Sequence, residues 1–175
     1  MKIEKASIID AEIIADINIK VWKTTYCNIL SNDTLTKREN QRQLTIETIQ
    51  NLIKINTYLI AKVDDVPVGF ILYGDLREIT NLESKKTGEV YAIYILENYK
   101  RKGIEKKIID DAIKDLISKD YKNLLIWGLK DNPCTKFYEK IGGIKMHTRK
   151  ISIFNDKLLE NSYYFDDIKT ILLNV

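Results

Sequence analysis

The sequence predicts a mixed α/β domain in which helices flank a sheet of mostly antiparallel strands. Three features indicate this class: a hairpin pattern around Asp64-Asp65, an apolar run that leads into a long amphipathic helix, and a closing pair of β-rich segments. The chain has 175 residues, of which 45% are hydrophobic and 30% are charged, as is usual for one soluble folded unit. We therefore expect a single domain over residues 1–175.

The first half of the chain is expected to begin with a short strand at Ile3–Ala6, followed by a helix that Asp10 caps. Apolar residues recur along that helix at helical spacing, at Ile13, Ile14, Ile17, Val21 and Trp22. The segment Ser31–Ile53 is polar and has no clean period, so it is predicted as helical pieces and loops. Two β-rich runs, Thr57–Val63 and Val66–Tyr73, then form the hairpin.

The second half is expected to begin with a central strand at Glu89–Leu96, because this run is almost entirely apolar, as in strands covered on both faces. A helix, a strand, a short helix and two closing strands follow. Their expected ranges are Gly103–Lys119, Asn123–Leu129, Pro133–Ile141, Ile144–Phe154 and Asn161–Phe165, with a turn between the last two at Asn155-Asp156.

The composition excludes several classes of protein. Lys and Arg total 28 against 25 Asp and Glu, and a net charge of +3 is too small to indicate a nucleic-acid-binding protein. The single histidine, His147, excludes zinc sites built from several histidines, and it is expected to be a surface or packing residue. The N-terminus lacks a secretory signal, and the longest apolar run, Val90–Leu96, is too short to span a membrane. We expect a cytoplasmic protein without a metal.

The segment Tyr99–Lys107 is the most informative part of the chain. It is basic, contains Gly103, and joins the central strand to the start of the long helix. Free amide groups and the helix dipole make such a helix start favourable for anions, and a glycine lets the backbone turn its N–H groups toward them. This pattern predicts a cradle for phosphate or pyrophosphate. The alternative is a solvated basic loop.

A second informative segment runs from Asp131 to Gly143. Asp131 or Asn132 can cap the short helix, and the spacing of its apolar residues lets them pack against the sheet. Tyr138 falls beside that packed face, where its phenol either reaches a ligand or belongs to the edge of the core. Cys134 begins the helix, but no histidine is close to it in sequence, so a nucleophilic cysteine is disfavoured.

Three motifs in this order resemble the GNAT superfamily of acyl-coenzyme A-dependent N-acetyltransferases: Gly88–Leu96, the basic loop at Gly103, and Asn132–Gly142. Trp22 and Tyr26 on the first helix are also similar to those of small bacterial members. The resemblance implies that two central strands splay apart and that acetyl-coenzyme A (acetyl-CoA) lies between them as co-substrate, with no metal.

The resemblance also implies a set of cofactor-binding residues, in which backbone groups hold the pantetheine arm and the pyrophosphate. The set is Ile93, Tyr94, Ile95, Lys100, Arg101, Lys102, Gly103, Ile104, Glu105, Lys106, Asn132, Phe137, Tyr138 and Lys140. A backbone N–H near Ile95 would polarise the thioester carbonyl. Glu105 departs from the family pattern, which has Gly or Ala at this place, and its carboxylate is expected to weaken coenzyme A binding.

By the same resemblance, Tyr138 protonates the departing thiolate. Glu89 is the candidate base, acting through water, or else a charge where the strand emerges. Trp22, Tyr26 and Tyr91, together with Tyr94, are candidate acceptor contacts or core residues. The acceptor is expected to be a small amine, a polyamine or a peptide amine. The alternative is a non-catalytic acyl-CoA-binding regulatory module, and the closing strands allow a homodimer.

Overall fold

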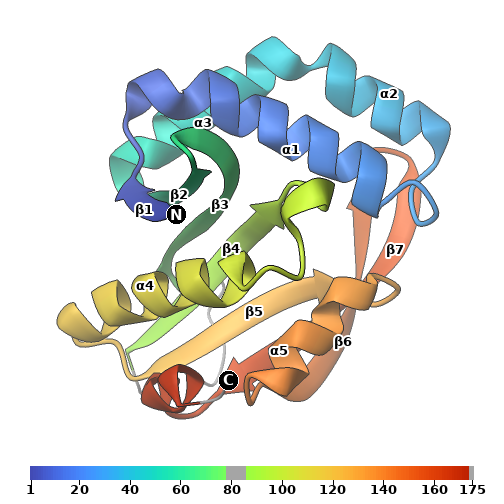
Figure 1. Ribbon diagram of the computed structural model, residues 1–175. Helices are drawn as coiled ribbons and strands as arrows, with labels where there is room; N and C mark the ends of the chain where they lie inside the picture. The colour runs from blue at the N-terminus through green and yellow to red at the C-terminus, as the bar shows by residue number, and fades with distance from the viewer. Residues whose placement is uncertain (78–85, 174–175) are drawn as a thin grey trace.

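The computed structural model describes residues 1–77 and 86–173 (Figure 1). Seven strands form one sheet in the order β1-β2-β3-β4-β5-β7-β6. The strands are β1 (Lys2–Lys5), β2 (Thr57–Val63), β3 (Val66–Asp75), β4 (Thr87–Ile95), β5 (Asn123–Leu129), β6 (Ile144–Ile153) and β7 (Asp156–Phe165). Only β4 and β5 pair in parallel, and every other pair is antiparallel. The predicted fold class, α/β with a mostly antiparallel sheet, is confirmed.

The helices cover both faces of the sheet, as Figure 1 shows. They are α1 (Ala11–Thr25), α2 (Asn32–Asn40), α3 (Arg42–Ile55), α4 (Ile104–Ser118) and α5 (Lys136–Lys140), with four short 3-10 turns at Ile8–Asp10, Glu97–Tyr99, Pro133–Thr135 and Ile168–Leu172. One core cluster joins α1 and α3 to side chains of β2 and β3 such as Tyr58 and Phe70. A second, larger cluster joins α4 and α5 to the opposite face, where Ile71 and Val90 lie, and a small third cluster contains Tyr26, Leu30, Leu35 and Leu129.

Most predicted elements are confirmed, and the errors lie at turns. The polar segment Ser31–Ile53 is almost continuously helical, because α2 and α3 follow each other directly. Asp10 precedes α1, but its carboxylate accepts hydrogen bonds from the amide and the hydroxyl of Ser7 and does not cap α1. The last turn lies at residues 154–155, one residue before the predicted position, and β7 begins at Asp156 instead of Asn161.

The described residues include no helix long and apolar enough to cross a membrane. Strand β6 forms an edge of the sheet, and its side chains Ile144 and Met146 are exposed. The predicted homodimer through the closing strands stays a prediction.

The pairing between β4 and β5 is short. It runs from Thr87 opposite Asn123 to Val90 opposite Ile126 and then stops. Both strands continue beyond this point, β4 to Ile95 and β5 to Leu129. The two central strands therefore separate over their C-terminal halves, and the splayed pair implied by the family resemblance is present.

Candidate active site

The separated half of β4 offers backbone groups without a strand partner. The Leu96 N–H donates a hydrogen bond of 2.9 Å to the Val68 carbonyl. This bond identifies the residues of β4 whose backbone N–H and C=O groups point toward β3. Because hydrogen-bonding directions alternate along an antiparallel strand, Ile93 and Ile95 turn their N–H and C=O groups away from β3, toward β5. The open edge can therefore bind an extended ligand as a further strand would bind.

The loop before α4 has the backbone geometry of an anion cradle. Gly103 is the N-cap of α4 and has a φ of 80°, a left-handed conformation that side chains rarely adopt. A Cβ atom at Gly103 would meet no atom within 4 Å, so the glycine is required by its φ and the space in front of it is open. The amides of the first turn of α4, beginning at Ile104, lack partners inside the helix.

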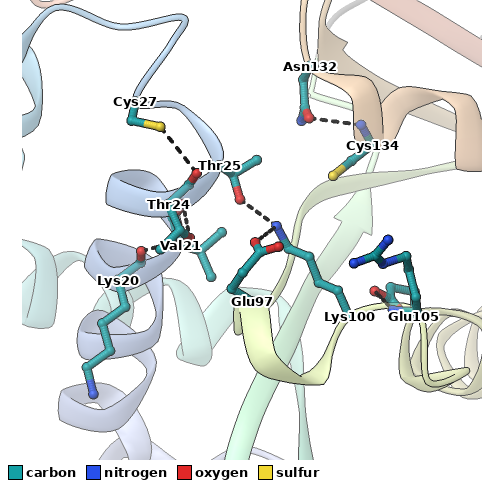
Figure 2. Close-up of polar contacts among 11 residues, drawn as sticks. Lys20, Val21, Thr24, Thr25, Cys27, Glu97, Lys100, Glu105, Asn132 and Cys134 are labelled. Atoms are coloured by element: carbon teal, nitrogen blue, oxygen red, sulfur yellow. Dashed lines mark hydrogen bonds and ion pairs between the residues drawn. The ribbon is translucent and has the colours of Figure 1, made fainter.

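The lysines of this loop are mostly engaged elsewhere. Lys100 places its Nζ 2.8 Å from Thr25 Oγ1 at the end of α1 and 2.6 Å from Glu97 Oε2 (Figure 2). Lys106 pairs with Asp110 one turn along α4 at 2.7 Å. Lys102 Nζ lies 5.4 Å from the centre of the Tyr99 ring. The cradle is therefore formed chiefly by backbone amides, and Lys100 ties the loop to α1.

Glu105 turns its carboxylate back into the loop. Its Oε1 lies 3.4 Å from the amide nitrogen of Arg101, which is one of the groups expected to face a phosphate. Arg101 itself has a φ of 58°, so the loop takes a left-handed conformation at two positions, Arg101 and Gly103. The Glu105 carboxylate thus accepts a hydrogen bond from the Arg101 amide, a donor that an anionic ligand would use.

Tyr138 lies buried at the start of the separated half of β5. It belongs to α5, and this helix packs closely on β5 because Gly128 has no side chain there. A Cβ atom at Gly128 would lie 2.7 Å from Thr135 Cγ2 and 3.3 Å from Tyr138 Cε2. Burial, with a smaller effect of the nearby Tyr94, raises the pKa of the Tyr138 phenol well above its ordinary value, so it stays protonated at neutral pH.

Three phenols gather where the two strands separate, and we call Tyr26, Tyr94 and Tyr138 the tyrosine cluster. Burial raises the pKa of Tyr26, and the neighbouring Tyr94 and Tyr138 add to this effect. Trp22 Nε1 donates a hydrogen bond of 3.3 Å to the Tyr94 hydroxyl. Burial also raises the pKa of the Cys134 thiol beside the cluster, which disfavours a thiolate nucleophile.

Asn132 and Lys140 flank Tyr138 at either end of its segment. The Asn132 side chain caps the turn before α5, because its Oδ1 accepts a hydrogen bond of 3.0 Å from the Cys134 amide (Figure 2). Lys140 is exposed at the last position of α5, and Phe137 is partly buried against the core cluster of α4. His147 is exposed on β6, as predicted.

A pocket of about 280 Å³ lies beside the tyrosine cluster, between the first three helices and strands β3 and β4. Three of the four predicted acceptor contacts line it, namely Trp22, Tyr91 and Tyr94, whereas Tyr26 does not. Two arginines, Arg38 of α2 and Arg77 after β3, also line it. The volume suits a small molecule.

The candidate base Glu89 is buried, with 2% of its surface exposed, and it pairs with Arg77. Its Oε1 accepts hydrogen bonds from Nε, at 3.0 Å, and Nη2 of Arg77, and its Oε2 accepts one of 3.0 Å from the Arg77 amide. The Arg77 guanidinium stacks 4.3 Å above the Tyr91 ring. A carboxylate has about four acceptor positions, so one stays available to a water.

Comparison with known proteins gives consistent matches. The FR47-like protein family matches residues 68–151. The uncharacterized N-acetyltransferase YuaI of Bacillus subtilis is 23% identical over 174 residues, which cover 98% of both chains. PaiA N-acetyltransferase from Thermoplasma acidophilum, solved with coenzyme A, aligns with a TM-score of 0.71 at 24% identity, over 91% of this chain and 98% of that one. A putative acetyltransferase from Salmonella typhimurium, YncA, was solved with acetyl-CoA. It aligns with a TM-score of 0.67 at 18% identity, over 95% of this chain and 93% of that one.

By its fold and by these matches, the chain is similar to N-acetyltransferases of the GNAT superfamily. Two of the matched structures hold coenzyme A or acetyl-CoA, and the residues described above fit acetyl-CoA as a co-substrate. The open edge at Ile93 and Ile95 fits an extended pantetheine arm, and the amides around Gly103 fit a pyrophosphate. When bound, acetyl-CoA would supply the activated acetyl group, while Tyr138 lies where the two strands separate.

Several residues of this candidate site were not predicted from the sequence. Arg38 and its partner Asn18 belong to different helices, and Arg38 falls in the segment without a clean period. Arg77 follows β3, and nothing in the local sequence pairs it with Glu89. Gly128 carries the one usable signal, because a glycine inside a predicted strand indicates a close approach of another segment.

Proposed function

We propose that this protein transfers the acetyl group of acetyl-CoA to a primary amine by direct attack within a ternary complex. The observation that carries the proposal is the position of a buried, protonated Tyr138 where β4 and β5 separate, near Tyr94, which lines a pocket of small-molecule size. The amine enters from the pocket, and the open edge of β4 and the Gly103 loop hold the co-substrate.

Each step assigns work to this chain's own groups. The Ile95 N–H donates a hydrogen bond to the thioester carbonyl, and Tyr138 donates its phenolic proton to the departing sulfur. The apolar surroundings that raise the pKa of the Tyr138 phenol would also raise the pKa of the coenzyme A thiol, because burial disfavours both anions. The two groups therefore stay matched for proton transfer.

Glu89 removes the proton of the attacking amine through water in this proposal. Glu89 precedes Ile95, whose N–H is assigned to the thioester carbonyl, by six residues, which is about 20 Å along a strand. This separation excludes direct contact between the carboxylate and an amine at the thioester, so the relay needs more than one water. Arg77, which lines the pocket, holds the Glu89 carboxylate in place.

A second candidate function is a non-catalytic acyl-CoA-binding regulatory module. The contact between Glu105 and the Arg101 amide favours it, because an internal carboxylate in the cradle competes with phosphate. The two candidates differ in turnover, since a binding module retains the thioester when an amine is present.

The test is to offer the purified protein acetyl-CoA with a panel of alkylamines, amino acids, polyamines and peptides and to follow the release of coenzyme A thiol. The proposed function predicts thiol release that depends on at least one amine. Saturable binding of acetyl-CoA, measured by calorimetry, without release for any amine would favour the regulatory module. The matched comparison is the same assay without an amine.

A further inference from the structure

Arg38 of α2 holds a fixed position in the wall of the pocket. Its Nε and Nη2 donate hydrogen bonds of 3.0 and 2.8 Å to Oδ1 of Asn18, a buried residue of α1. Its guanidinium stacks above the Trp22 ring, with Cζ 4.7 Å from the ring centre. One face and one edge of the guanidinium are thus held by neutral groups, which fixes the direction of the other edge.

Arg38 differs from the other arginines near it in having no acidic partner. Arg77 pairs with Glu89 in the same pocket, and Arg42, close by on α3, pairs with Asp16 at 2.6 Å. Across residues 1–77 and 86–173, the hydrogen bonds and ring contacts of Arg38 are those with Asn18 and Trp22, and the phenols of Tyr94 and Tyr58 also interact with its charge. The wall of the pocket at Arg38 therefore carries a positive charge that no carboxylate of the described chain balances.

The cost of this arrangement is visible in the pKa of Arg38, which burial lowers from its ordinary value. A half-buried cation that hydrogen-bonds only to an amide oxygen and stacks on an aromatic ring is poorly compensated, and an anion in the pocket would restore the balance. One N–H of Nη1 and the second N–H of Nη2 form the edge that Asn18 leaves unused. This edge has the fork geometry that binds a carboxylate through two parallel hydrogen bonds.

We propose that the acceptor is a small amine that also carries a carboxylate, and that Arg38 binds this carboxylate while the amine faces the tyrosine cluster. The inference rests on the proposed function, because it names the acceptor of the same site. It favours an amino acid over a polyamine, since a second ammonium group would face the unbalanced charge of Arg38. The pocket of about 280 Å³ suits an acceptor of this size.

The test compares acceptors that differ only at the end remote from the amine. Thiol release is measured for a series of ω-amino acids of increasing length, with the alkylamines, diamines and aminoalkyl phosphates of the same lengths. Wild type is expected to have a kcat/KM for the best ω-amino acid about 10- to 100-fold above its alkylamine, as for one charge-assisted bidentate contact. Arg38→Gln should remove this preference, and Arg38→Lys should restore part of it.

Arg42→Gln is the matched control, because it removes a guanidinium from the neighbouring helix outside the pocket lining and should leave the preference unchanged. Thermal unfolding and acetyl-CoA binding of each variant check that the fold and the co-substrate site are intact. A wild-type preference for diamines, alkylamines or aminoalkyl phosphates would overturn the inference, as would an Arg38→Gln variant that keeps the preference for ω-amino acids.

A binding measurement separates this inference from the proposed function. The same ω-amino acids are titrated by calorimetry into the complex of the protein with coenzyme A. Binding that Arg38→Gln abolishes, with no turnover of any amine, would support the carboxylate site and contradict amine acetylation. Turnover of diamines without binding or turnover of ω-amino acids would leave the proposed function standing and overturn the carboxylate site. If neither process occurs, both are wrong.

Discussion

The two sides of the candidate site are built in different ways. The side for acetyl-CoA consists of backbone groups, namely the open edge at Ile93 and Ile95 and the amides around Gly103, with Tyr138 beside them. The side proposed for the acceptor consists of side chains from α1, α2, α3 and the sheet, among them Arg38 and Tyr94. Backbone groups bind one constant ligand whatever the nearby side chains are, whereas the acceptor side is free to differ between relatives.

This difference decides what could be predicted from the sequence. A strand, a glycine and a helix start lie within a short stretch of chain, so their pattern predicts the cradle at Gly103 and the strand beside it. The segment after β5 places Tyr138 beside a packed face in the same way, but its role as a proton donor is implied by the family resemblance. These features depend on local spacing, which the sequence displays directly.

The acceptor side depends on contacts between distant segments. Arg38 meets Asn18 across 20 positions, and Arg77 meets Glu89 across 12. The segment that forms α2 and α3 is largely polar. Because α2 buries only Thr34 and Leu35, too few apolar residues recur along it to show a helical period. The sequence therefore predicts that an acceptor pocket with aromatic walls exists but does not predict its charge.

The largest effect is expected where the two sides meet. Tyr138→Phe removes the proton donor and should lower kcat about 10²- to 10³-fold, while acetyl-CoA binding changes little. Steady-state kinetics and calorimetry measure the two quantities. Tyr121→Phe, which removes a phenol that donates to Asp75, is the control and should keep wild-type kcat.

The pH dependence of wild type gives a second check on Tyr138. Because its pKa is raised, the phenol remains a donor up to at least about pH 10, the ordinary pKa of tyrosine. The rate should therefore rise with pH as the amine loses its proton and show no decline below that value. A descending limb near pH 8 that Tyr138→Phe abolishes would contradict the raised pKa.

Glu89→Gln tests the proposed proton relay. We expect kcat to fall about 10- to 100-fold. Loss of the ion pair with half-exposed Arg77 should lower the free energy of unfolding by about 1–2 kcal/mol. Glu160→Gln, which breaks a comparable pair with Arg149, should change stability alone. An unchanged kcat in Glu89→Gln would assign Glu89 a structural role.

Gly103→Ala tests whether the acetyl-CoA side depends on backbone conformation. A side chain at a φ of 80° costs about 1 kcal/mol, and relaxation of the loop would turn its amides away from the ligand. The Kd for acetyl-CoA should rise about 10-fold, whereas the KM for the amine should not change. Gly103→Asn is the control, because asparagine tolerates the left-handed conformation and should bind nearly as wild type. Equal losses in both variants would show that the open space, and not φ, matters.

The smallest effect is expected at Glu105. Glu105→Ala frees the Arg101 amide and removes a negative charge near the pyrophosphate, so acetyl-CoA should bind about threefold more tightly. Calorimetry at low ionic strength measures this change. Asp111→Ala removes a carboxylate from a later turn of α4 and should have a smaller effect. Weaker binding in Glu105→Ala would show that the contact with Arg101 shapes the cradle instead of blocking it.

The most direct test of the central claim is to follow the acetyl group itself. The protein is incubated with acetyl-CoA that carries an isotopically labelled acetyl group, together with an equimolar mixture of primary amines, and the products are identified by mass spectrometry. The proposed function predicts label on an amine nitrogen in the wild-type reaction and a large loss of this product in Tyr138→Phe. Label that stays on coenzyme A with every amine, in a protein that binds acetyl-CoA, would contradict it.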